Sequence, residues 1–305
     1  MDSKYTEGRY WKVMNISGKG KGVLARKDIK QGELIVADTP LFIVPPDAHS
    51  QNKNTLDNYL DCAVKNLNPL DRETFWNLAD SKSIQGKTPR GIYFTNCYSI
   101  GQGSSTRFPT AMLPILSRIN HSCRPNSEFH WNPEQGYEEL RASRCILEGE
   151  EITDCYLDLT AQGRITQQER RSLLKSGYGF DCNCEVCSLS FNLLEKDDKL
   201  RVEAFNLSQT CFDLKNSFSS EQMVEVLRKA ERWFFLRKSL GYKLTHQLEA
   251  AEVVWHLAML LGEDEIASNI CREGNLLADI RFGADSQEVQ IWREKESNPV
   301  KYLLG

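Results

Sequence analysis

Short apolar runs separated by polar turns occupy the first 46 residues of the chain. The runs lie at residues 13–16, 22–25, 34–37 and 41–44. Glycine-containing turns at residues 18–20 and 30–33 separate them. Runs of this length between such turns are typical of β-strands. We therefore predict a meander of small antiparallel sheets at the start of the chain.

A helical pattern interrupts this β region. Apolar side chains recur at three- and four-residue intervals from Leu56 to Leu67, which places them on one face of a helix. A second short helix is predicted around Phe75, Leu78 and Ala79. Residues 91–100 are then predicted to return to strand, and residues 101–114 to form a loop. The helical piece is thus expected as an insert within a β domain.

After Cys187 the pattern is helical to the end of the chain. Three apolar faces are visible: Met223, Val226, Leu227, Ala230, Trp233 and Phe234; then Leu248, Ala251, Val254, Trp255, Ala258 and Met259; then Ile266, Ile270, Leu277 and Ile280. The last helix is predicted to end near Gly283. The turn at residues 261–264 resembles those of tetratricopeptide arrays, and a plain helical bundle is the alternative. The two alternatives differ in whether a concave groove exists.

Composition and charge narrow the possible classes of protein. At 305 residues, with 40% hydrophobic and 26% charged positions, the chain has a globular composition and room for two cores. The net charge of -4 gives no reason to expect direct nucleic-acid binding, and an acidic surface suits a basic peptide. The N-terminal residues lack a signal-peptide pattern, and no apolar run approaches the roughly 18 residues of a membrane span. We expect an intracellular protein, cytoplasmic or nuclear or both, without a membrane anchor.

The cysteine pattern indicates a metal site. The chain has 10 cysteines, and Cys182, Cys184 and Cys187 lie within six residues. In a reducing compartment, cysteines this close together favour a metal over disulfides, and tetrahedral zinc is the usual one. Such a site needs a fourth ligand, which the spacing alone leaves open. The dispersed residues Cys62, Cys97, Cys211 and Cys271 are interpreted as small core residues.

Two further motifs carry the strongest functional signal. Residues 118–126 read Arg118-Ile119-Asn120-His121-Ser122-Cys123-Arg124-Pro125-Asn126. Residues 149–156 read Gly149-Glu150-Glu151-Ile152-Thr153-Asp154-Cys155-Tyr156. In letters, order and separation, the pair resembles the SET-domain protein lysine methyltransferases. The turn Lys19-Gly20-Lys21-Gly22 is similar to the basic glycine-rich turn that opens SET domains, where missing side chains let backbone amides approach the cofactor.

The resemblance implies an organisation for the whole chain. It is closest to SMYD-type and related fungal SET proteins, in which an insert splits the SET domain and a helical domain follows. We expect an α+β fold with a SET-type β core, a helical insert, a zinc-bound post-SET segment and an all-α C-terminal domain, which is either tetratricopeptide-like or a plain helical bundle. The expected boundaries are 1–46 and 91–160 for the two SET portions, 47–90 for the insert, 161–191 for the post-SET segment and 192–305 for the helical domain. A MYND zinc finger is not expected, because residues 45–90 contain only His49 and Cys62 as candidate ligands.

Roles for individual residues follow from the same resemblance. Tyr156 is expected to orient the substrate amine, and Tyr98 and Tyr178 to line the lysine channel with it. Cofactor contacts are expected from Lys19, Gly20, Lys21, Asn96, Ser117, Asn120, His121, Tyr178 and Phe180. The fourth zinc ligand implied is Cys123. Cys145 and Cys155 are the competitors, and alternation along a strand that presents Tyr156 to the site turns Cys155 to the opposite face.

These residues suit methyl transfer to an amine. The amine of a free lysine has a pKa of about 10.4, yet only its neutral form attacks. An apolar aromatic channel lowers that pKa because it disfavours the ammonium. The zinc would be structural, since four sulfur ligands leave no open position for substrate or water. His121 is not expected to act as a general base or a metal ligand.

The expected activity is S-adenosylmethionine-dependent protein-lysine N-methylation, on a histone or another protein. A SET scaffold without activity, which binds peptides or partner proteins, is the alternative. Methylation of a non-lysine amine is a weaker one. The helical domain is a candidate surface for partner proteins, and the resemblance favours a monomer. The motifs do not specify the target lysine or the number of methyl groups added.

Overall fold

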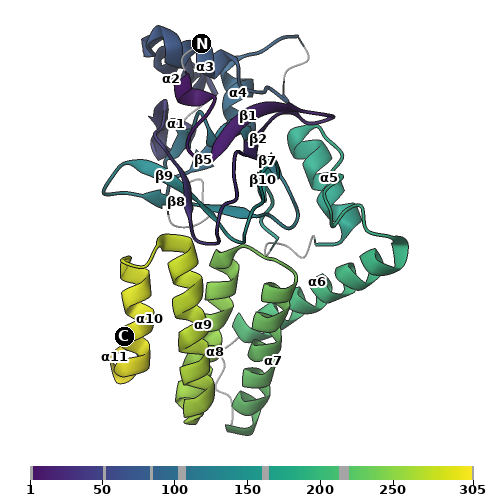
Figure 1. Cartoon of the computed structure of the whole chain (residues 1–305), viewed down its shortest axis with the longest axis vertical. Helices are drawn as coiled ribbons and strands as arrows, with labels where there is room; N and C mark the ends of the chain where they lie inside the picture. Colours follow the sequence, from purple (N-terminus) through teal and green to yellow (C-terminus); the bar gives the residue numbers. More distant parts are fainter. Residues whose placement is uncertain are drawn as a thin grey trace.

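The computed structural model describes residues 3–50, 53–82, 85–101, 108–159, 165–212 and 220–303. Figure 1 shows a part rich in short strands above a row of long helices, with the C-terminus at the outer end of that row. The predicted α+β class, with small antiparallel sheets and a helical C-terminal region, is confirmed. The predicted boundary at residue 160 lies outside the described residues.

Ten short strands form three small sheets in the described part of the chain. The first sheet has the order β1 (Trp11–Ile16), β2 (Gly20–Ala25), β10 (Glu151–Asp154), β7 (Asn120–His121). The second has the order β3 (Leu34–Asp38), β9 (Tyr137–Ala142), β8 (Ser127–Asn132). The third has the order β4 (Phe42–Val44), β6 (Thr110–Met112), β5 (Cys97–Ser99). The four strands predicted before residue 46 are therefore confirmed, whereas the predicted loop at residues 101–114 contains β6.

The insert consists of short helices that pack on the third sheet. They are α1 (Pro46–Ser50), α2 (Lys53–Asn66), α3 (Pro69–Trp76) and α4 (Pro89–Asn96). The predicted apolar face of α2 is confirmed, since Leu60 and Val64 are buried with Phe75 of α3. The second helix lies earlier than predicted. Asn68 caps it and Pro69 occupies its first turn, and it ends at Trp76, before Leu78 and Ala79.

The strand predicted for residues 91–96 is wrong, because this segment is the helix α4. The Thr88 side chain accepts a hydrogen bond from the Gly91 amide at 2.9 Å, which caps the helix, and Pro89 occupies its first turn. Ile92 and Tyr93 are fully buried on the inner face of α4. Their β-favouring side chains suggested a strand, but the Thr-Pro start signal decides the conformation.

From residue 167 onward, the described part of the chain is mainly helical. Its helices are α5 (Gln167–Tyr178), α6 (Phe191–Phe212), α7 (Ser220–Ser239), α8 (Leu244–Leu261), α9 (Asp264–Phe282), α10 (Gln287–Ser297) and α11 (Val300–Leu303). Helix α5 was not predicted from the sequence. Among the helices that the structure describes, none is both long and apolar enough to cross a membrane.

The helices from α6 to α10 pack side by side in chain order (Figure 1). Trp233 of α7 and Trp255 of α8 are almost completely buried between them. The turn predicted at residues 261–264 is confirmed, since Gly262 ends α8 with a φ of 71°, a conformation that suits glycine. Helix α9 also contacts β8 and β9. This contact attaches the row of helices to the second sheet.

Candidate active site and cysteine cluster

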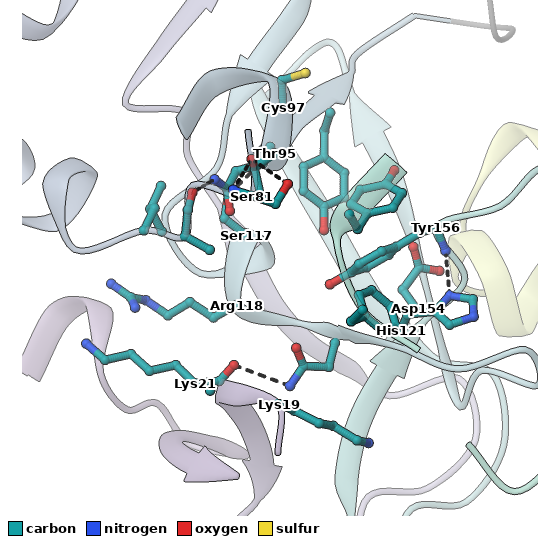
Figure 2. Close-up of a pocket in the computed structure, with 18 of the residues that line it drawn as sticks. Lys19, Lys21, Ser81, Thr95, Cys97, Ser117, Arg118, His121, Asp154 and Tyr156 are labelled. Carbon is teal, nitrogen blue, oxygen red and sulfur yellow. Dashed lines mark hydrogen bonds between the residues drawn. The ribbon is translucent and has the colours of Figure 1, made fainter. Parts of the chain in front are cut away.

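A pocket of about 620 Å³ opens where the first and third sheets meet α5. The structure brings together here every residue predicted to bind the cofactor or the substrate lysine: Lys19, Gly20, Lys21, Asn96, Tyr98, Ser117, Asn120, His121, Tyr156, Tyr178 and Phe180. Figure 2 shows Lys21 and Arg118 at one side of the pocket and Asp154, His121 and Tyr156 at the other. The pocket thus has a basic side and an aromatic side.

Pairing of β7 with β10 joins the two sequence motifs. The strands run parallel, with Asn120 opposite Thr153 and His121 opposite Asp154. The chain then continues to Tyr156, whose backbone amide donates a hydrogen bond to Nδ1 of His121 at 3.1 Å. Burial lowers the pKa of His121 to about 4, so the imidazole is neutral near neutral pH and is able to accept this bond.

Aromatic side chains from separate segments form one wall. The rings of Tyr156 and Tyr178 have centroids 4.8 Å apart, and Tyr98 meets Phe129 edge-on at 5.0 Å. The hydroxyl of Tyr156 donates to the Ile119 carbonyl at 2.6 Å, and that of Tyr98 to the Leu116 carbonyl at 2.8 Å. Burial raises the pKa of all three tyrosines, so their hydroxyls stay protonated.

The glycine-rich turn approaches the first motif closely. A Cβ atom on Gly22 would lie within 2.6 Å of both Cδ1 of Ile16 and Nδ2 of Asn120, so a larger residue there would have to displace both side chains. Asn120 donates to Oε1 of Glu151 at 2.8 Å and to the Lys21 carbonyl at 3.3 Å. The Lys19 ammonium lies 2.6 Å from Oε2 of Glu151. These contacts hold the turn against the end of β7.

Two of the predicted cofactor contacts are engaged within the protein. Asn96 donates from Nδ2 to the Ala79 carbonyl at 2.7 Å and to the Ile92 carbonyl at 2.6 Å. Ser117 donates to the Asn96 carbonyl at 3.2 Å. These bonds tie the end of α4 to residues 77–81, which also line the pocket. In this structure Asn96 and Ser117 shape the pocket wall.

Sequence reasoning missed Arg118, the most buried cation of the basic side. Arg118 is 8% exposed, and within the described residues its Nε has no hydrogen-bond partner. Burial lowers the pKa of Lys21, and the nearby charges of Arg118 and Lys87 lower it further. Lys87 donates to the carbonyls of Trp76 and Leu78. An uncompensated positive charge inside a pocket suits an anionic group of a ligand. In the sequence, Arg118 is the first residue of the motif that contains Asn120 and His121. That position is the signal from which it could have been found.

The four predicted zinc ligands lie together at the edge of this pocket. The sulfur atoms of Cys123, Cys182, Cys184 and Cys187 are all within 4.8 Å of one another, and all four residues are buried. Sγ of Cys123 lies 3.6 Å from Sγ of Cys187. Tetrahedral zinc with zinc–sulfur bonds of about 2.3 Å requires sulfur pairs about 3.8 Å apart, so the donor set fits zinc. Of the competitors, Cys145 is exposed and Cys155 packs in the helical core.

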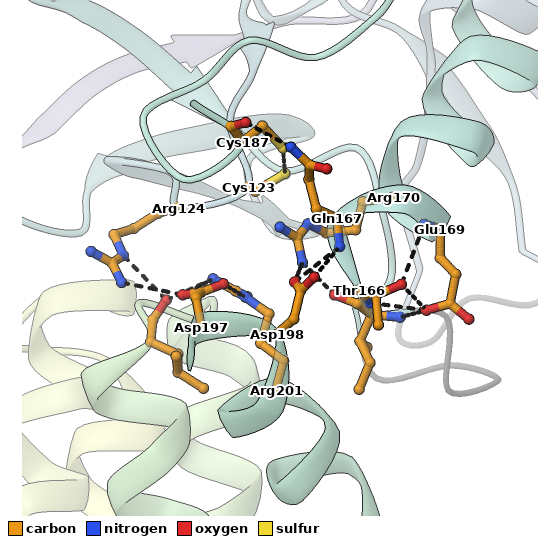
Figure 3. A network of polar contacts seen from close by, with 12 residues as sticks. Cys123, Arg124, Thr166, Gln167, Glu169, Arg170, Cys187, Asp197, Asp198 and Arg201 are labelled. Carbon is orange, nitrogen blue, oxygen red and sulfur yellow. Dashed lines mark hydrogen bonds and ion pairs between the residues drawn. The ribbon is translucent and has the colours of Figure 1, made fainter. Parts of the chain in front are cut away.

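Helix α5 supports the cysteine cluster, and sequence reasoning missed it. Gln167 donates to the Cys187 carbonyl at 2.8 Å, and Arg171 to the Cys182 carbonyl at 2.9 Å. Arg170 is fully buried beside the cluster and pairs with Asp198 of α6 at 3.3 Å (Figure 3). Burial alone would lower the pKa of Arg170, but the Cys123 and Cys187 thiolates raise it. A capping box of Thr166 and Glu169 begins α5 and was a readable signal.

Comparisons with known proteins agree with this geometry. A family model described as "SET domain" matches residues 20–157. The histone-lysine N-methyltransferase set5 of Schizosaccharomyces pombe is 30% identical over 299 residues, covering 98% of this chain and 87% of the relative. The mouse histone-lysine N-methyltransferase SMYD3 is 31% identical over 132 residues, covering 42% of this chain and 29% of the relative. The human protein-lysine N-methyltransferase SMYD4 is 26% identical over 219 residues, covering 65% and 26% respectively.

The set5 relative is similar along nearly the full length of both chains, whereas the chain spans under a third of the SMYD relatives. Together with the joined motifs and the four-cysteine cluster, this similarity decides the family. The chain belongs to the SET-domain protein lysine N-methyltransferases, enzymes that take their methyl group from S-adenosylmethionine.

Proposed function

We propose that the pocket holds S-adenosylmethionine on its basic side and the substrate lysine on its aromatic side, with Tyr156 as the catalytic residue. The observation that carries this proposal is the Tyr156 side chain, whose ring lies beside that of Tyr178 in a pocket that also contains the glycine-rich turn. The name of the set5 relative makes a histone the first substrate to test.

The cofactor side is assigned by charge and shape. Lys21 and Arg118 would hold the carboxylate of the cofactor, since both cations line the pocket. Asn120, His121 and Phe180 would contact its amino group and its adenine ring. When bound, S-adenosylmethionine supplies a methyl group on a positively charged sulfur, and a neutral amine accepts that methyl group. Substitution Arg118→Met should weaken cofactor binding about tenfold, the value of one charged hydrogen bond, whereas the exposed Arg144→Met should not.

The lysine side is assigned by its aromatic groups. Tyr98, Tyr156 and Tyr178 would surround the alkyl chain of the substrate and exclude water, which disfavours the ammonium form of its amine. The Tyr156 hydroxyl donates its proton to the Ile119 carbonyl, so its oxygen is left as an acceptor. An amine N–H donated to that oxygen would orient the nitrogen lone pair.

The four cysteines would assist without taking part in the chemistry. Zinc bound by four thiolates has no open position, so its effect would be to hold residues 178–187 in place. This segment supplies Tyr178 to the lysine side and Phe180 to the cofactor side. Metal binding would therefore complete two walls of the pocket at once.

The test is methyl transfer to purified core histones by the wild type and Tyr156→Phe. We expect turnover to fall about a hundredfold, because the amine loses its orienting acceptor, while calorimetry finds unchanged cofactor affinity. Tyr59→Phe is the matched control, since that hydroxyl also donates to a carbonyl, of Ile43, but outside the pocket. Unchanged turnover in the Tyr156 variant would remove the proposed mechanism.

A further inference from the structure

One buried carboxylate on the aromatic side has no role in the mechanism described so far. Asp154 ends β10, lines the pocket and is 2% exposed. Its charge contributes to the raised pKa of Tyr98, Tyr156 and Tyr178, the residues proposed to surround the substrate lysine. Figure 2 shows the Asp154 carboxylate beside Tyr156. An acidic group therefore lies next to the place where the substrate amine reacts.

A lysine from the helical part of the molecule meets this carboxylate from outside the pocket. The Nζ atom of Lys243 lies 2.8 Å from Oδ1 of Asp154, and their side chains are 15% and 3% exposed. The same ammonium lies 4.6 Å from the centre of the Phe129 ring, which packs on Tyr98. The buried pair thus forms the back of the aromatic wall.

The position of Lys243 is fixed by a second carboxylate. Lys243 directly precedes α8, and Glu128 of β8 accepts hydrogen bonds from the Leu244 amide at 2.5 Å and the Thr245 amide at 3.2 Å. Arg281 of α9 also pairs with Glu128. Because Glu128 caps the start of α8 in this way, the neighbouring Lys243 is held against Asp154.

The other groups around this pair leave it electrically balanced. The titratable groups that face it from neighbouring elements are Glu128, Glu138, Arg281, His121, His246, Cys155, Tyr98, Tyr156 and Tyr178. Burial lowers the pKa of His246 to about 4 and raises the pKa of Glu138 to about 8, so both are uncharged near neutral pH. Nδ1 of His121 accepts a hydrogen bond from the Tyr156 amide, so that nitrogen carries no proton and the imidazole is neutral. Burial also raises the pKa of Cys155 to about 11.

Of the groups named, the charged ones form two ion pairs, Asp154 with Lys243 and Glu128 with Arg281. Burial raises the pKa of Asp154, and the Lys243 ammonium lowers it. Without Lys243, the Asp154 carboxylate would be ionised only with another cation beside it, and the substrate ammonium is that cation. A negative charge within about 4–6 Å raises the pKa of an ammonium by about one to three units. The substrate amine must release one proton to solvent before its nitrogen forms the new C–N bond, while the methyl–sulfur bond breaks and its electron pair stays on the sulfur. In the absence of Lys243 the amine would stay protonated to higher pH.

We propose that Lys243 neutralises Asp154 and thereby lets the substrate amine lose its proton near neutral pH. Lys243 acts through Asp154 and is a positioning residue for the reaction. The inference rests on the proposed lysine site. It gives the helical part a direct electrostatic role in catalysis.

The experiment measures kcat/KM against pH, from 6.5 to 10, with core histones and saturating S-adenosylmethionine. The rising limb of this profile is the pH range in which kcat/KM increases as the substrate amine loses its proton. We expect Lys243→Met to move this limb about one to two pH units upward. Lys243→Arg keeps the positive charge. Its rising limb should therefore stay at the wild-type pH, even where its maximal kcat/KM differs from that of the wild type. The double variant Lys243→Met/Asp154→Asn should return the limb to that position, because both charges are gone.

An unshifted limb in Lys243→Met, or a double variant that stays shifted like the single one, overturns the inference. If Lys243→Met fails to fold, Lys243→Gln takes its place, because it keeps a hydrogen-bond donor for Asp154 without the charge and should show the same upward shift. Tyr156→Phe in the same assay separates the two proposals. Full activity of that variant refutes the lysine site itself, whereas reduced activity with an unshifted Lys243→Met limb refutes only the role of Lys243.

Discussion

The strands and the helices of this protein bury opposite charges. The strands bury five carboxylates, those of Asp38, Glu128, Glu138, Glu139 and Asp154. The described helices from α5 onward bury four cations and one carboxylate: Arg170, Arg201, Arg237, Lys295 and Asp197. A buried charged group is tolerated only when it has a partner of opposite charge or is in its neutral form. The strands must therefore compensate buried carboxylates, and the helices must compensate buried cations.

The two parts solve it differently. The helices pair their cations mostly among themselves, as Arg201 does with Asp197 at 2.7 Å and Arg237 with Glu249 at 2.7 Å. The strands obtain the partners of Asp154 and Glu128 from the helical part, and burial raises the pKa of Asp38 to about 7. The strand part, which carries most of the candidate active site, therefore depends on the helices for its electrostatics, whereas the helices depend on the strands far less.

The largest expected effect comes from the cysteine cluster, which joins Cys123 of the first motif to the segment leading into α6. Substitution Cys184→Ser removes one of four ligands, so zinc should be lost. Activity should fall below detection, because Tyr178 and Phe180 are no longer held at the pocket. The measurements are metal content and methyl transfer. The exposed Cys145→Ser is the control and should keep both at the wild-type level.

The next largest effect tests whether the helices are stabilised by their own hydrophobic core. Trp233 is fully buried in the helical core, so Trp233→Ala should lower the free energy of unfolding by about 4 kcal/mol through lost burial and a cavity. Phe235 on the same helix is 57% exposed, and Phe235→Ala should cost less than about 0.5 kcal/mol. Chemical denaturation followed by circular dichroism measures both. Equal costs would mean that the helical core does not hold this part together.

A smaller effect is expected at the contact between the two parts. Glu128→Gln removes a buried carboxylate and leaves Arg281 without its charge partner, which should cost about 3 kcal/mol of unfolding free energy. Glu203→Gln breaks an exposed pair with Arg232 and should cost less than about 1 kcal/mol. Thermal and chemical unfolding of the two variants compare the same substitution in both settings. Similar losses would contradict the dependence of the strands on the helices.

The smallest effect concerns the pH dependence of stability. Burial raises the pKa of Asp38 to about 7, so the folded protein keeps this carboxyl protonated where the unfolded chain has lost the proton. The raised pKa of Asp38 therefore adds to the free energy of unfolding. This contribution is fully present below about pH 4 and is lost as the pH rises towards 7. Asp38→Asn, whose side-chain oxygen replaces the acceptor of the Ile115 and Leu116 amides, lacks this loss.

The stability of Asp38→Asn relative to wild type should therefore increase by about 1 kcal/mol between pH 6 and pH 7. Denaturant melts at half-unit steps of pH provide the measurement. A constant difference between the two proteins across this range would show that Asp38 is already ionised in the folded state.

Local signals explain which elements were predictable. The four early strands, the face of α2 and the turn after α8 follow from periodicity and turn residues, and the structure has them in place. Helices α4 and α5 were missed although each has a cap, at Thr88 and at Thr166. At both helices the capping residue decides the conformation, although the apolar pattern is weak or misleading. Capping residues at the boundaries therefore predict these two helices better than side-chain propensity does.

The amino-acid sequence by itself determined the family, the positions of the pocket residues in the chain and the four clustered cysteines, because spaced motifs carry that information. Only the tertiary structure decided that β7 pairs with β10 and that Lys243 meets Asp154, 89 residues away. Such contacts depend on how distant segments close against each other, and no local propensity encodes them. For the same reason Arg118, Arg170 and Asp154 become candidates for function only once their burial and partners are known.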